Sequence, residues 1–416
     1  MNLRTQPYKG ARDFYPEDKR IQKYMFRVLR QVVESYGYQE YDAPLLEYFE
    51  IYAAKSGEEI VNEQLYSFED RGGRRVAIRP EMTPSVSRMV AARRQELAYP
   101  LRLYSLPNLW RYERPQRGRL REHWQLNVDL FGIEGLEGDL EIIQVADAVL
   151  KAFGATPESY RINVNSRKAM VSAMKSFSMD EAELKAVYKL IDKMPKLSHE
   201  QFQKILTDNL SDEKAAKLIE YLNSNEPPAH IRQLLDKLSG AGVVNAVYEP
   251  SVVRGIEYYS DVVFEVFDKN EENNRSMFGG GRYDGLVAQF GVEPVPTVGF
   301  GMGDVTLQNF LEAHKLLPQL KPETDAVVVL IGDVYERAQP ELAKMRFGGL
   351  NLALDNTGRK LDAQIKNAVK SGVRFALFIG EKELADKKFK LRDLEKGEEN
   401  EFNLDELISK LKIHRT

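Results

Sequence analysis

Residues 111–121 read Arg-Tyr-Glu-Arg-Pro-Gln-Arg-Gly-Arg-Leu-Arg, and this is the most informative stretch of the chain. It places five arginines and one glutamate around Pro115 and Gly118, two residues that favour a turn over a helix. Arginine carries a planar, permanently charged guanidinium group that pairs with phosphate oxygens two at a time. The stretch therefore predicts a loop that grips a polyphosphate, with a solvated charged loop of no function as the alternative.

The segments on either side of this loop have the composition of β-strands. Residues 101–104 and 124–131 are short runs in which apolar, aromatic and branched side chains recur. Two such runs joined by a turn are typical of a hairpin. The sequence therefore predicts that the arginines lie on the loop of a hairpin.

The composition is that of a globular protein. A chain of 416 residues predicts two or three domains, and its 43% hydrophobic and 29% charged residues are ordinary for a soluble protein. No apolar run approaches the roughly 20 residues that cross a bilayer, and residues 1–10 lack the apolar core of a signal peptide. We therefore expect a cytoplasmic protein without membrane association.

Two residue types exclude several kinds of site. The chain has no cysteine, which excludes disulfides, thiolate zinc sites and cysteine nucleophiles. Its five histidines are scattered without metal-ligand spacing, so we predict no transition metal held by the protein. The net charge of -4 argues against indiscriminate nucleic-acid binding but leaves room for a local basic surface.

The rest of the chain shows three patterns. Residues 1–165 and 251–312 mix strand-like runs with Gly and Pro turns. Between them, from residue 167 to about residue 239, apolar residues recur at helical spacing, which predicts a helical insertion. After residue 322, short strands alternate with helices, which predicts a compact α/β domain with parallel strands. Those strands are expected at residues 326–331, 351–355 and 375–379.

A second group of polar and aromatic residues begins at Arg254. Residues 254–267 read Arg-Gly-Ile-Glu-Tyr-Tyr-Ser-Asp-Val-Val-Phe-Glu-Val-Phe, with a strand expected in the second half. An arginine, a glutamate and two tyrosines at the start of a strand fit a pocket for a small polar, aromatic or cationic ligand, although such a tyrosine pair often only packs. The glycine runs at residues 279–285 and 299–303 lack P-loop and dinucleotide spacing, so we expect them to let the backbone approach a ligand.

Taken in order, these segments resemble histidyl-tRNA synthetase, a class II aminoacyl-tRNA synthetase, over essentially the whole chain. Residues 9–16 (KGARDFYP) resemble the opening of that family, and residues 79–83 (RPEMT) resemble its amino-acid-binding signature. Residues 110–132 resemble class II motif 2, and residues 254–265 and 280–286 resemble the two histidine-specific motifs. Residues 324–416 resemble the anticodon-binding domain.

The resemblance implies an α+β fold with a six-stranded antiparallel class II catalytic sheet. It assigns residues 1–166 and 246–316 to the catalytic domain, residues 167–245 to a helical insertion domain, and residues 324–416 to an α/β anticodon-binding domain. It also implies a homodimer whose interface includes the motif 1 region at residues 38–44.

The resemblance further implies a ligase reaction in two steps. The carboxylate of histidine attacks the α-phosphate of ATP and releases pyrophosphate, and the histidyl group of the adenylate then passes to the 3′ end of tRNA-His. ATP is expected to be used with Mg²⁺. In-line displacement at phosphorus builds negative charge that preorganised cations stabilise.

By family position, Arg111 and Arg254 are the candidates for the clamp on the α-phosphate. Glu113 is expected to accept a hydrogen bond from the adenine amino group. Arg119 and Arg121 lie on the loop that would meet the β- and γ-phosphates or the acceptor end of the tRNA.

The family pattern also supplies a histidine site. A carboxylate and two oxygen acceptors match the three donors of an α-ammonium group, and they are expected from Glu81, Thr83 and Gln125. Both imidazole nitrogens would be paired in a pocket formed by Asp129, Tyr258, Tyr259 and Tyr283. Such pairing rejects analogues that lack the nitrogens far better than shape alone.

The chain departs from the family pattern in several places. Asp129 stands where many members have Glu, and Thr306 stands where class II motif 3 usually has an arginine that grips the γ-phosphate. Another loop arginine or Mg²⁺ must therefore neutralise that phosphate, or ATP binds less tightly. Glu257 and the pair Ser260-Asp261 also differ from the commoner Asp and Thr-Gly.

Two alternatives stay open at this point. One is a catalytically silent synthetase-like regulatory subunit of ATP phosphoribosyltransferase, favoured only by the missing motif 3 arginine. The complete C-terminal domain and the Arg-Gly-x-x-Tyr-Tyr pattern argue against it. The other is a class II synthetase for proline or threonine, against which the tyrosine pair and the Gly-Gly-Arg-Tyr-Asp-Gly segment argue.

Overall fold

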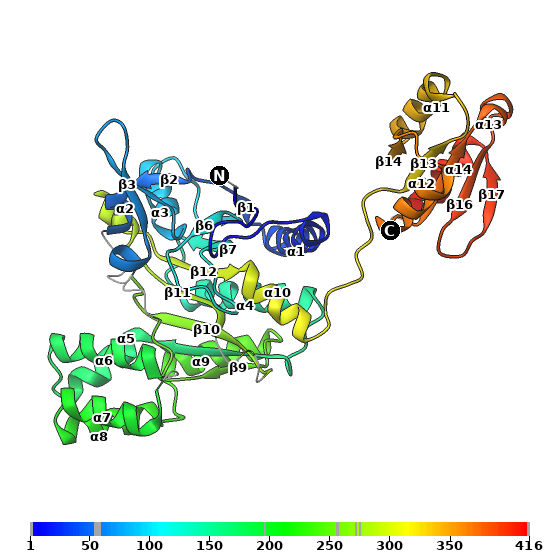
Figure 1. Cartoon of the computed structure of the whole chain (residues 1–416). Coiled ribbons are helices and arrows are strands. Elements are labelled where there is room, and N and C mark those ends of the chain that lie inside the picture. The colour runs from blue at the N-terminus through cyan, green and yellow to red at the C-terminus, as the bar shows by residue number, and fades with distance from the viewer. Residues whose placement is uncertain are drawn as a thin grey trace. The chain divides into compact units, whose positions relative to one another are not determined.

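The computed structural model describes residues 3–53, 60–194, 197–254, 258–270, 273 and 276–413. It forms two compact units, one of Met1–Phe14 with Gln22–Leu317 and one of Tyr15–Ile21 with Pro318–Thr416 (Figure 1). The predicted departure at Glu257 lies outside the described residues. No helix in the described part of the chain is long and apolar enough to span a membrane.

The first unit is built on one large sheet with the strand order β1-β5-β7-β12-β11-β10-β8-β9. The strands are β1 (Gln39–Glu40), β5 (Leu101–Ser105), β7 (Glu122–Phe131), β8 (Tyr160–Ser166), β9 (Ala246–Tyr248), β10 (Val262–Asp268), β11 (Ser276–Arg282) and β12 (Thr297–Gly303). The strands from β5 to β8 pair antiparallel, which confirms the expected antiparallel sheet. The edge strands β1 and β9 pair parallel with β5 and β8, an extension that the sequence did not predict.

The predicted hairpin is present, with one strand more than expected. The short strand β6 (Asn108–Trp110) pairs antiparallel with the start of β7, so that Trp110 lies opposite Glu122. The arginine-rich loop, residues 111–121, connects these two strands. Because the far half of β7 is buried in the sheet, the loop is attached to a rigid element.

Helices pack on this sheet through apolar faces. On α1 (Pro16–Ser35) the buried Met25, Leu29 and Val33 recur at a spacing of four residues, as expected for one helix face. The helices α4 (Leu136–Ala152) and α10 (Asp304–Ala313) contact β7 and β12. The unit also contains α2 (Phe49–Ala53), α3 (Thr83–Ala92) and a three-stranded sheet of β2 (Leu46–Tyr48), β4 (Arg75–Ile78) and β3 (Tyr66–Glu69), and α2 contacts both α3 and this sheet.

The predicted helical stretch is also confirmed. It consists of α5 (Arg167–Ser176), α6 (Glu181–Lys193), α7 (His199–Asn209), α8 (Asp212–Leu222) and α9 (Ala229–Gly240), drawn in green in Figure 1. Asp180 and Ser198 form capping boxes at the starts of α6 and α7. Met170, Val187 and Leu206 lie in one buried apolar cluster. The helices belong to the same compact unit as the sheet.

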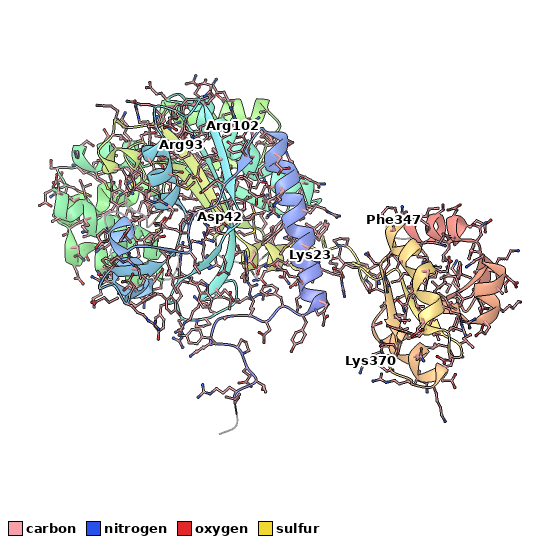
Figure 2. All side chains as sticks on the ribbon, turned by 90° about the horizontal axis from the view of Figure 1, so that it is seen from above. Lys23, Asp42, Arg93, Arg102, Phe347 and Lys370 are labelled. Atoms are coloured by element: carbon pink, nitrogen blue, oxygen red, sulfur yellow. The ribbon has the colours of Figure 1, made fainter. Side chains whose placement is uncertain are left out.

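The second unit is an α/β domain with the strand order β14-β13-β15-β16-β17. The strands are β13 (Ala326–Leu330), β14 (Leu352–Asp355), β15 (Phe375–Ile379), β16 (Phe389–Asp393) and β17 (Glu399–Phe402), and the helices are α11 (Tyr335–Phe347), α12 (Leu361–Lys370), α13 (Glu381–Asp386) and α14 (Leu404–Ile413). The first three strands are parallel as predicted, whereas β16 and β17 add an antiparallel pair that the sequence did not predict. Phe347 and Lys370, both labelled in Figure 2, are the last residues of α11 and α12.

Candidate active site

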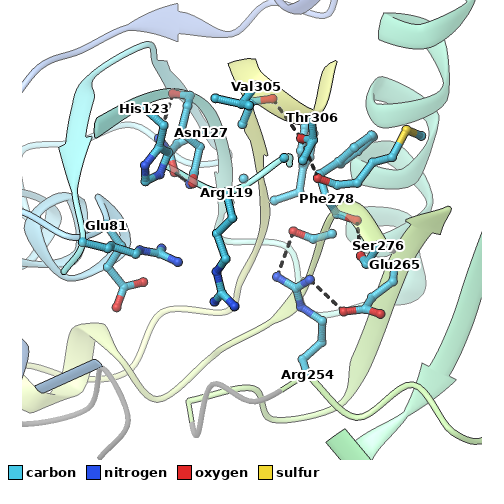
Figure 3. A pocket seen from close by; sticks show the side chains of 18 of the residues that line it. Glu81, Arg119, His123, Asn127, Arg254, Glu265, Ser276, Phe278, Val305 and Thr306 are labelled. Atoms are coloured by element: carbon cyan, nitrogen blue, oxygen red, sulfur yellow. Dashed lines mark hydrogen bonds and ion pairs between the residues drawn. The ribbon is translucent and has the colours of Figure 1, made fainter. Parts of the chain in front are cut away.

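A cavity of about 630 Å³ lies in the first unit (Figure 3). Its walls come from β7, β10, β11, β12, the arginine-rich loop and the start of α10. The structure brings together nearly all the residues that the sequence analysis selected. Those that line the cavity are Glu81, Thr83, Arg111, Glu113, Arg119, Gln125, Asp129, Arg254, Tyr258, Tyr259 and Tyr283.

Strand β7 supplies one wall of the cavity because alternate residues of a strand face the same side of a sheet. His123, Gln125, Asn127 and Asp129 all line the cavity. The Gln125 side-chain amide donates to Asn127 Oδ1 at 2.7 Å, which orients both groups. Sequence reasoning missed His123 and Asn127, although the two-residue period running back from Asp129 would have found them.

Arg254 is held rigidly at the other side of the cavity. Its Nη1 lies 3.0 Å from Glu265 Oε1 and its Nη2 donates to the carbonyl oxygen of Gly279 at 3.3 Å (Figure 3). Burial lowers the pKa of Arg254, but Tyr259 and Glu265 more than offset that effect, so the guanidinium stays charged. Its backbone has φ of 54°, a conformation that is uncommon for a residue with a side chain and that occurs at functional sites.

The arginine-rich loop brings further charges to the cavity. Arg111 donates from Nε to the carbonyl oxygen of Pro80 at 2.8 Å. This hydrogen bond does not use the two terminal nitrogens of the guanidinium, which can therefore contact a ligand. Arg119 forms an ion pair with Glu113, and both side chains line the cavity. The turn between them closes through backbone hydrogen bonds of Gln116 and Arg119 at 2.9 Å. Cations and one carboxylate therefore stand together on the loop side of the cavity.

Arg121 is the one selected residue that does not line the cavity. Its Nε donates to the carbonyl oxygen of Glu113 at 3.0 Å and its Nη1 donates to the Tyr8 hydroxyl at 2.9 Å. Its guanidinium carbon lies 3.9 Å from the centre of the Tyr112 ring. The expected contact of Arg121 with the β- and γ-phosphates therefore has no support in this geometry, because its side chain is buried at the base of the loop.

A carboxylate and a tyrosine stand deep in the cavity. The Tyr283 hydroxyl donates to Asp129 Oδ1, and both residues are almost fully buried. Gly299 makes room for this pair, since a Cβ atom there would lie 2.6 Å from Asp129 Oδ1 and 2.8 Å from the Tyr283 hydroxyl. Burial raises the pKa of Asp129 to about 7 against the effect of the Tyr283 hydrogen bond. Within the described residues, Asp129 Oδ2 has no hydrogen-bond partner.

Aromatic rings surround this carboxylate. The ring centres of Tyr258 and Tyr259 lie 5.0 Å apart, and those of Tyr258 and Tyr283 lie 5.4 Å apart. The Tyr258 hydroxyl donates to Glu81 Oε2 at 3.1 Å, so a second buried carboxylate stands beside the rings. A pocket with aromatic walls and two carboxylates suits a small ligand that carries a ring and positive charge.

His123 contributes a neutral imidazole to the loop side of the cavity. Burial, together with the nearby charges of Arg111 and Arg12, lowers the pKa of His123 to about 3. The ring therefore stays uncharged at neutral pH. It can accept or donate a hydrogen bond there without adding to the positive charge of the cavity.

Residues 10–305 match the family model described as histidyl-tRNA synthetase, and residues 325–414 match the model of an anticodon binding domain. The chain belongs to the histidyl-tRNA synthetase family. A histidine–tRNA ligase of Leptospira biflexa is 41% identical over an alignment of 433 positions, which covers 99% of this chain and 98% of the relative. A histidine–tRNA ligase of Thermoplasma volcanium is 37% identical over 98% of both chains.

Solved structures agree with this family. The histidyl-tRNA synthetase of Nostoc sp. PCC 7120 superposes with a TM-score of 0.82 over 99% of this chain and all of that one, at 23% identity. A Bacillus halodurans protein titled as an ATP phosphoribosyltransferase regulatory subunit/histidyl-tRNA synthetase has a TM-score of 0.75 at 22% identity. At such identities the likeness shows the class II synthetase fold with its anticodon-binding domain, and the regulatory alternative gains nothing over the synthetase.

Thr306 occupies the place where the histidyl-tRNA synthetase resemblance leads us to expect an arginine. Its hydroxyl lies 2.9 Å from the carbonyl oxygen of Met277 and 3.1 Å from that of Gly303, and it can donate to either (Figure 3). These hydrogen bonds connect the first turn of α10 with β11 and with the end of β12. A Cβ atom at Gly118 would lie 3.6 Å from Thr306 Cγ2. The turn of the arginine-rich loop therefore lies against Thr306. The arginines of this loop are thus positive charges close to the place where the motif 3 arginine is expected.

The carboxylates that line the cavity form no cluster of metal ligands within the described part of the chain. Among the described residues, no group of three or more His, Cys, Asp or Glu side chains could hold a metal ion. The cavity carboxylates Glu113 and Glu265 are each paired with an arginine.

Proposed function

We infer that this protein joins histidine to tRNA-His with the energy of ATP, as a histidine–tRNA ligase. The observation that carries the inference is one cavity with two chemically different ends. Arginines stand at the loop side, where a polyphosphate would bind, and a carboxylate among tyrosines stands deep in the cavity, where an imidazole would bind. The family membership of the chain supports the same conclusion.

Arg111 and Arg254 are proposed to hold the α-phosphate. An oxygen of the histidine carboxylate attacks phosphorus, the bond to the β-phosphate oxygen breaks, and pyrophosphate leaves with the electron pair. Negative charge grows on the non-bridging oxygens during this step, and fixed cations stabilise it without reorganisation. The ion pair with Glu265 supports this role, since it holds Arg254 before ATP enters.

Glu81, Thr83 and Gln125 are proposed to bind the α-ammonium group of histidine. Asp129 and Tyr283 are proposed to pair with the imidazole, with Tyr258 and Tyr259 as its aromatic walls. The raised pKa of Asp129 supports this assignment, because a carboxyl group that titrates near 7 can exchange a proton with an imidazole of similar pKa. The shorter Asp in place of Glu keeps the same acceptor chemistry.

Glu113 is proposed to accept a hydrogen bond from the adenine amino group. Arg119 is proposed to neutralise the β- and γ-phosphates, because the uncharged Thr306 cannot do so. Mg²⁺ bound to ATP would supply further positive charge there.

Replacing Arg119 by alanine is expected to raise the KM for ATP by about tenfold or more, since hydrogen bonds to charged groups contribute about 1.5–3 kcal/mol. Exchange kinetics at varied ATP concentration measure this; an unchanged KM would rule Arg119 out.

We also propose the assembly and organisation that the family pattern implies. Residues 167–245 form the helical insertion, residues 1–166 and 246–316 the catalytic domain, and residues 324–416 the anticodon-binding domain. The protein works in the cytoplasm as a homodimer with residues 38–44 in its interface. Light scattering of the purified protein tests the dimer.

The first test is ATP–pyrophosphate exchange, because it reports amino-acid activation without tRNA. Exchange is expected with histidine and not with proline, threonine or glycine, since only histidine pairs with Asp129 and Tyr283. Exchange with histidine would also show that Thr306 is tolerated in motif 3. A folded protein that binds histidine but exchanges with none of the four amino acids would favour the regulatory alternative.

A further inference from the structure

The segment of residues 8–14, which we call the N-terminal strap, binds the base of the arginine-rich loop from outside the cavity. The carbonyl oxygen of Gly10 accepts from the backbone N–H groups of Arg121 at 3.0 Å and Glu122 at 3.1 Å. The backbone N–H of Arg12 donates to Glu122 Oε2 at 3.3 Å. The strap is thus attached where the loop ends and β7 begins.

A chain of contacts leads from the strap to the cavity through Arg121. The Tyr8 hydroxyl accepts from Arg121 Nη1, and the Arg121 guanidinium carbon lies 5.6 Å from the ring centre of Tyr8 and 3.9 Å from that of Tyr112. Arg121 Nε in turn donates to the carbonyl oxygen of Glu113. The Glu113 carboxylate then pairs with Arg119 inside the cavity. A shift of the strap would therefore move two groups of the proposed ATP subsite.

The strap also reaches the opposite side of that subsite through Arg12. Arg12 Nη2 lies 2.8 Å from Asp304 Oδ2, and Asp304, the first residue of α10, is almost fully buried. Asp304 Oδ1 accepts from the backbone N–H of Trp124 on β7 at 2.9 Å. The Arg12 guanidinium lies over the rings of Phe14 and Trp124, at 4.9 and 5.9 Å. The start of α10, against which the loop turn lies, is thus fixed by the same segment.

We propose that the N-terminal strap is a positioning element for ATP, acting through Arg121 on the loop and through Asp304 on α10. This inference rests on the proposed function, because it concerns the ATP subsite. A loop with five arginines repels itself, and ordering it costs conformational entropy. A loop whose base is already anchored loses less entropy when ATP binds, which raises affinity. The histidine pocket shares none of the strap contacts described above.

The sharpest test replaces Gly10 with alanine. Gly10 has φ of 85°, and a Cβ atom there would lie 2.8 Å from Arg121 Cγ and 3.0 Å from its Cβ, so Arg121 must move. The matched control is Gly242→Ala, which has φ of 86° and nothing within 4 Å of the new atom. We expect Gly10→Ala to raise the KM for ATP by about tenfold, which is about 1.4 kcal/mol, with the KM for histidine unchanged. The control should change neither KM.

A milder variant guards against a general folding defect. Tyr8→Phe removes only the hydroxyl that accepts from Arg121, and the control Tyr15→Phe removes a tyrosine hydroxyl from an exposed residue seven positions further along the chain. We expect a threefold to tenfold higher KM for ATP in Tyr8→Phe alone, with an unchanged melting temperature. A KM for ATP equal to that of the controls, or an equal rise in the KM for histidine, would overturn the strap proposal.

Direct titration of each variant with Mg²⁺–ATP in a calorimeter separates this proposal from the proposed function. If the wild-type protein binds ATP but shows no histidine-dependent exchange, the proposed function fails. The strap proposal is then still decided, because Gly10→Ala must weaken ATP binding by about tenfold and Gly242→Ala must not. Equal affinities for ATP in these two variants overturn it.

Discussion

Adenylate formation is expected to fall by a factor of about 100 to 1000 when Arg254 is replaced by alanine. Removing one preorganised donor from a developing oxyanion typically costs about 3–4 kcal/mol in the barrier. Arg254 is proposed to be such a donor, and Glu265 and Gly279 already hold its guanidinium in place. Histidine binding should change little, because the imidazole pocket is formed by other residues. Pyrophosphate exchange measures the rate, and calorimetry measures histidine binding.

The same change leaves Glu265 without its cation, so stability needs its own control. Burial already raises the pKa of Glu265 even though Arg254 opposes that effect. An uncompensated buried charge is destabilising, whereas removing both partners is often close to neutral. The double variant Arg254→Ala/Glu265→Gln should therefore regain stability without regaining exchange. Recovery of exchange in the double variant, or normal exchange in Arg254→Ala, would refute the clamp. Arg93→Ala, at an exposed ion pair, serves as the surface arginine control.

Replacing Asp129 with asparagine is expected to have opposite effects on histidine use and on stability. Asparagine keeps the size of the side chain but cannot carry the charge or exchange a proton with the imidazole. We expect histidine activation to fall by about a hundredfold, in line with the loss of a hydrogen bond to a charged group. The KM for ATP should not change, because Asp129 is proposed to contact only the imidazole.

The stability effect follows from the direction of the pKa shift. The pKa of Asp129 is about 7 in the folded protein and near 4 in the unfolded chain. The ionised carboxylate therefore disfavours the fold, and this cost is absent below pH 4, grows between pH 4 and 7, and is constant above pH 7. Asparagine removes the cost, which has an upper limit of about 4 kcal/mol.

Melting temperatures at two pH values test this second prediction. Asp129→Asn should melt higher than the wild-type protein at pH 8, with a smaller difference at pH 5. Asp70→Asn is the control of opposite sign, since backbone and Arg74 hydrogen bonds lower the pKa of Asp70 on the exposed surface. The same melting difference at both pH values would contradict the assigned pKa of Asp129.

Local patterns in the sequence were enough to predict many of the helices and strands and to select residues that line the cavity. The strand-like composition of residues 124–131 and the turn residues Pro115 and Gly118 predicted the strand and the loop, because both follow from local backbone preferences. The helical spacing of residues 167–239 predicted the helices α5 to α9 for the same reason. Most selected site residues line the cavity because they belong to short motifs whose spacing reflects the elements that carry them.

Tertiary contacts decided what those motifs do in space. The sequence placed Arg121 among the ATP residues, but Tyr8, more than a hundred positions away, holds it at the base of the loop. Glu265 was not selected, yet this residue of β10 is the partner that orients Arg254, which lies in the segment before that strand. Such pairings join residues that are not neighbours in the sequence, so no local pattern predicts them. Burial also shifts the pKa of a carboxyl group, and the burial of a residue is decided by the tertiary structure. The sequence by itself thus determined many of the elements and the residue types of the site, whereas the tertiary structure determined which charges meet, as where Glu265 and Gly279, paired on β10 and β11, both contact Arg254.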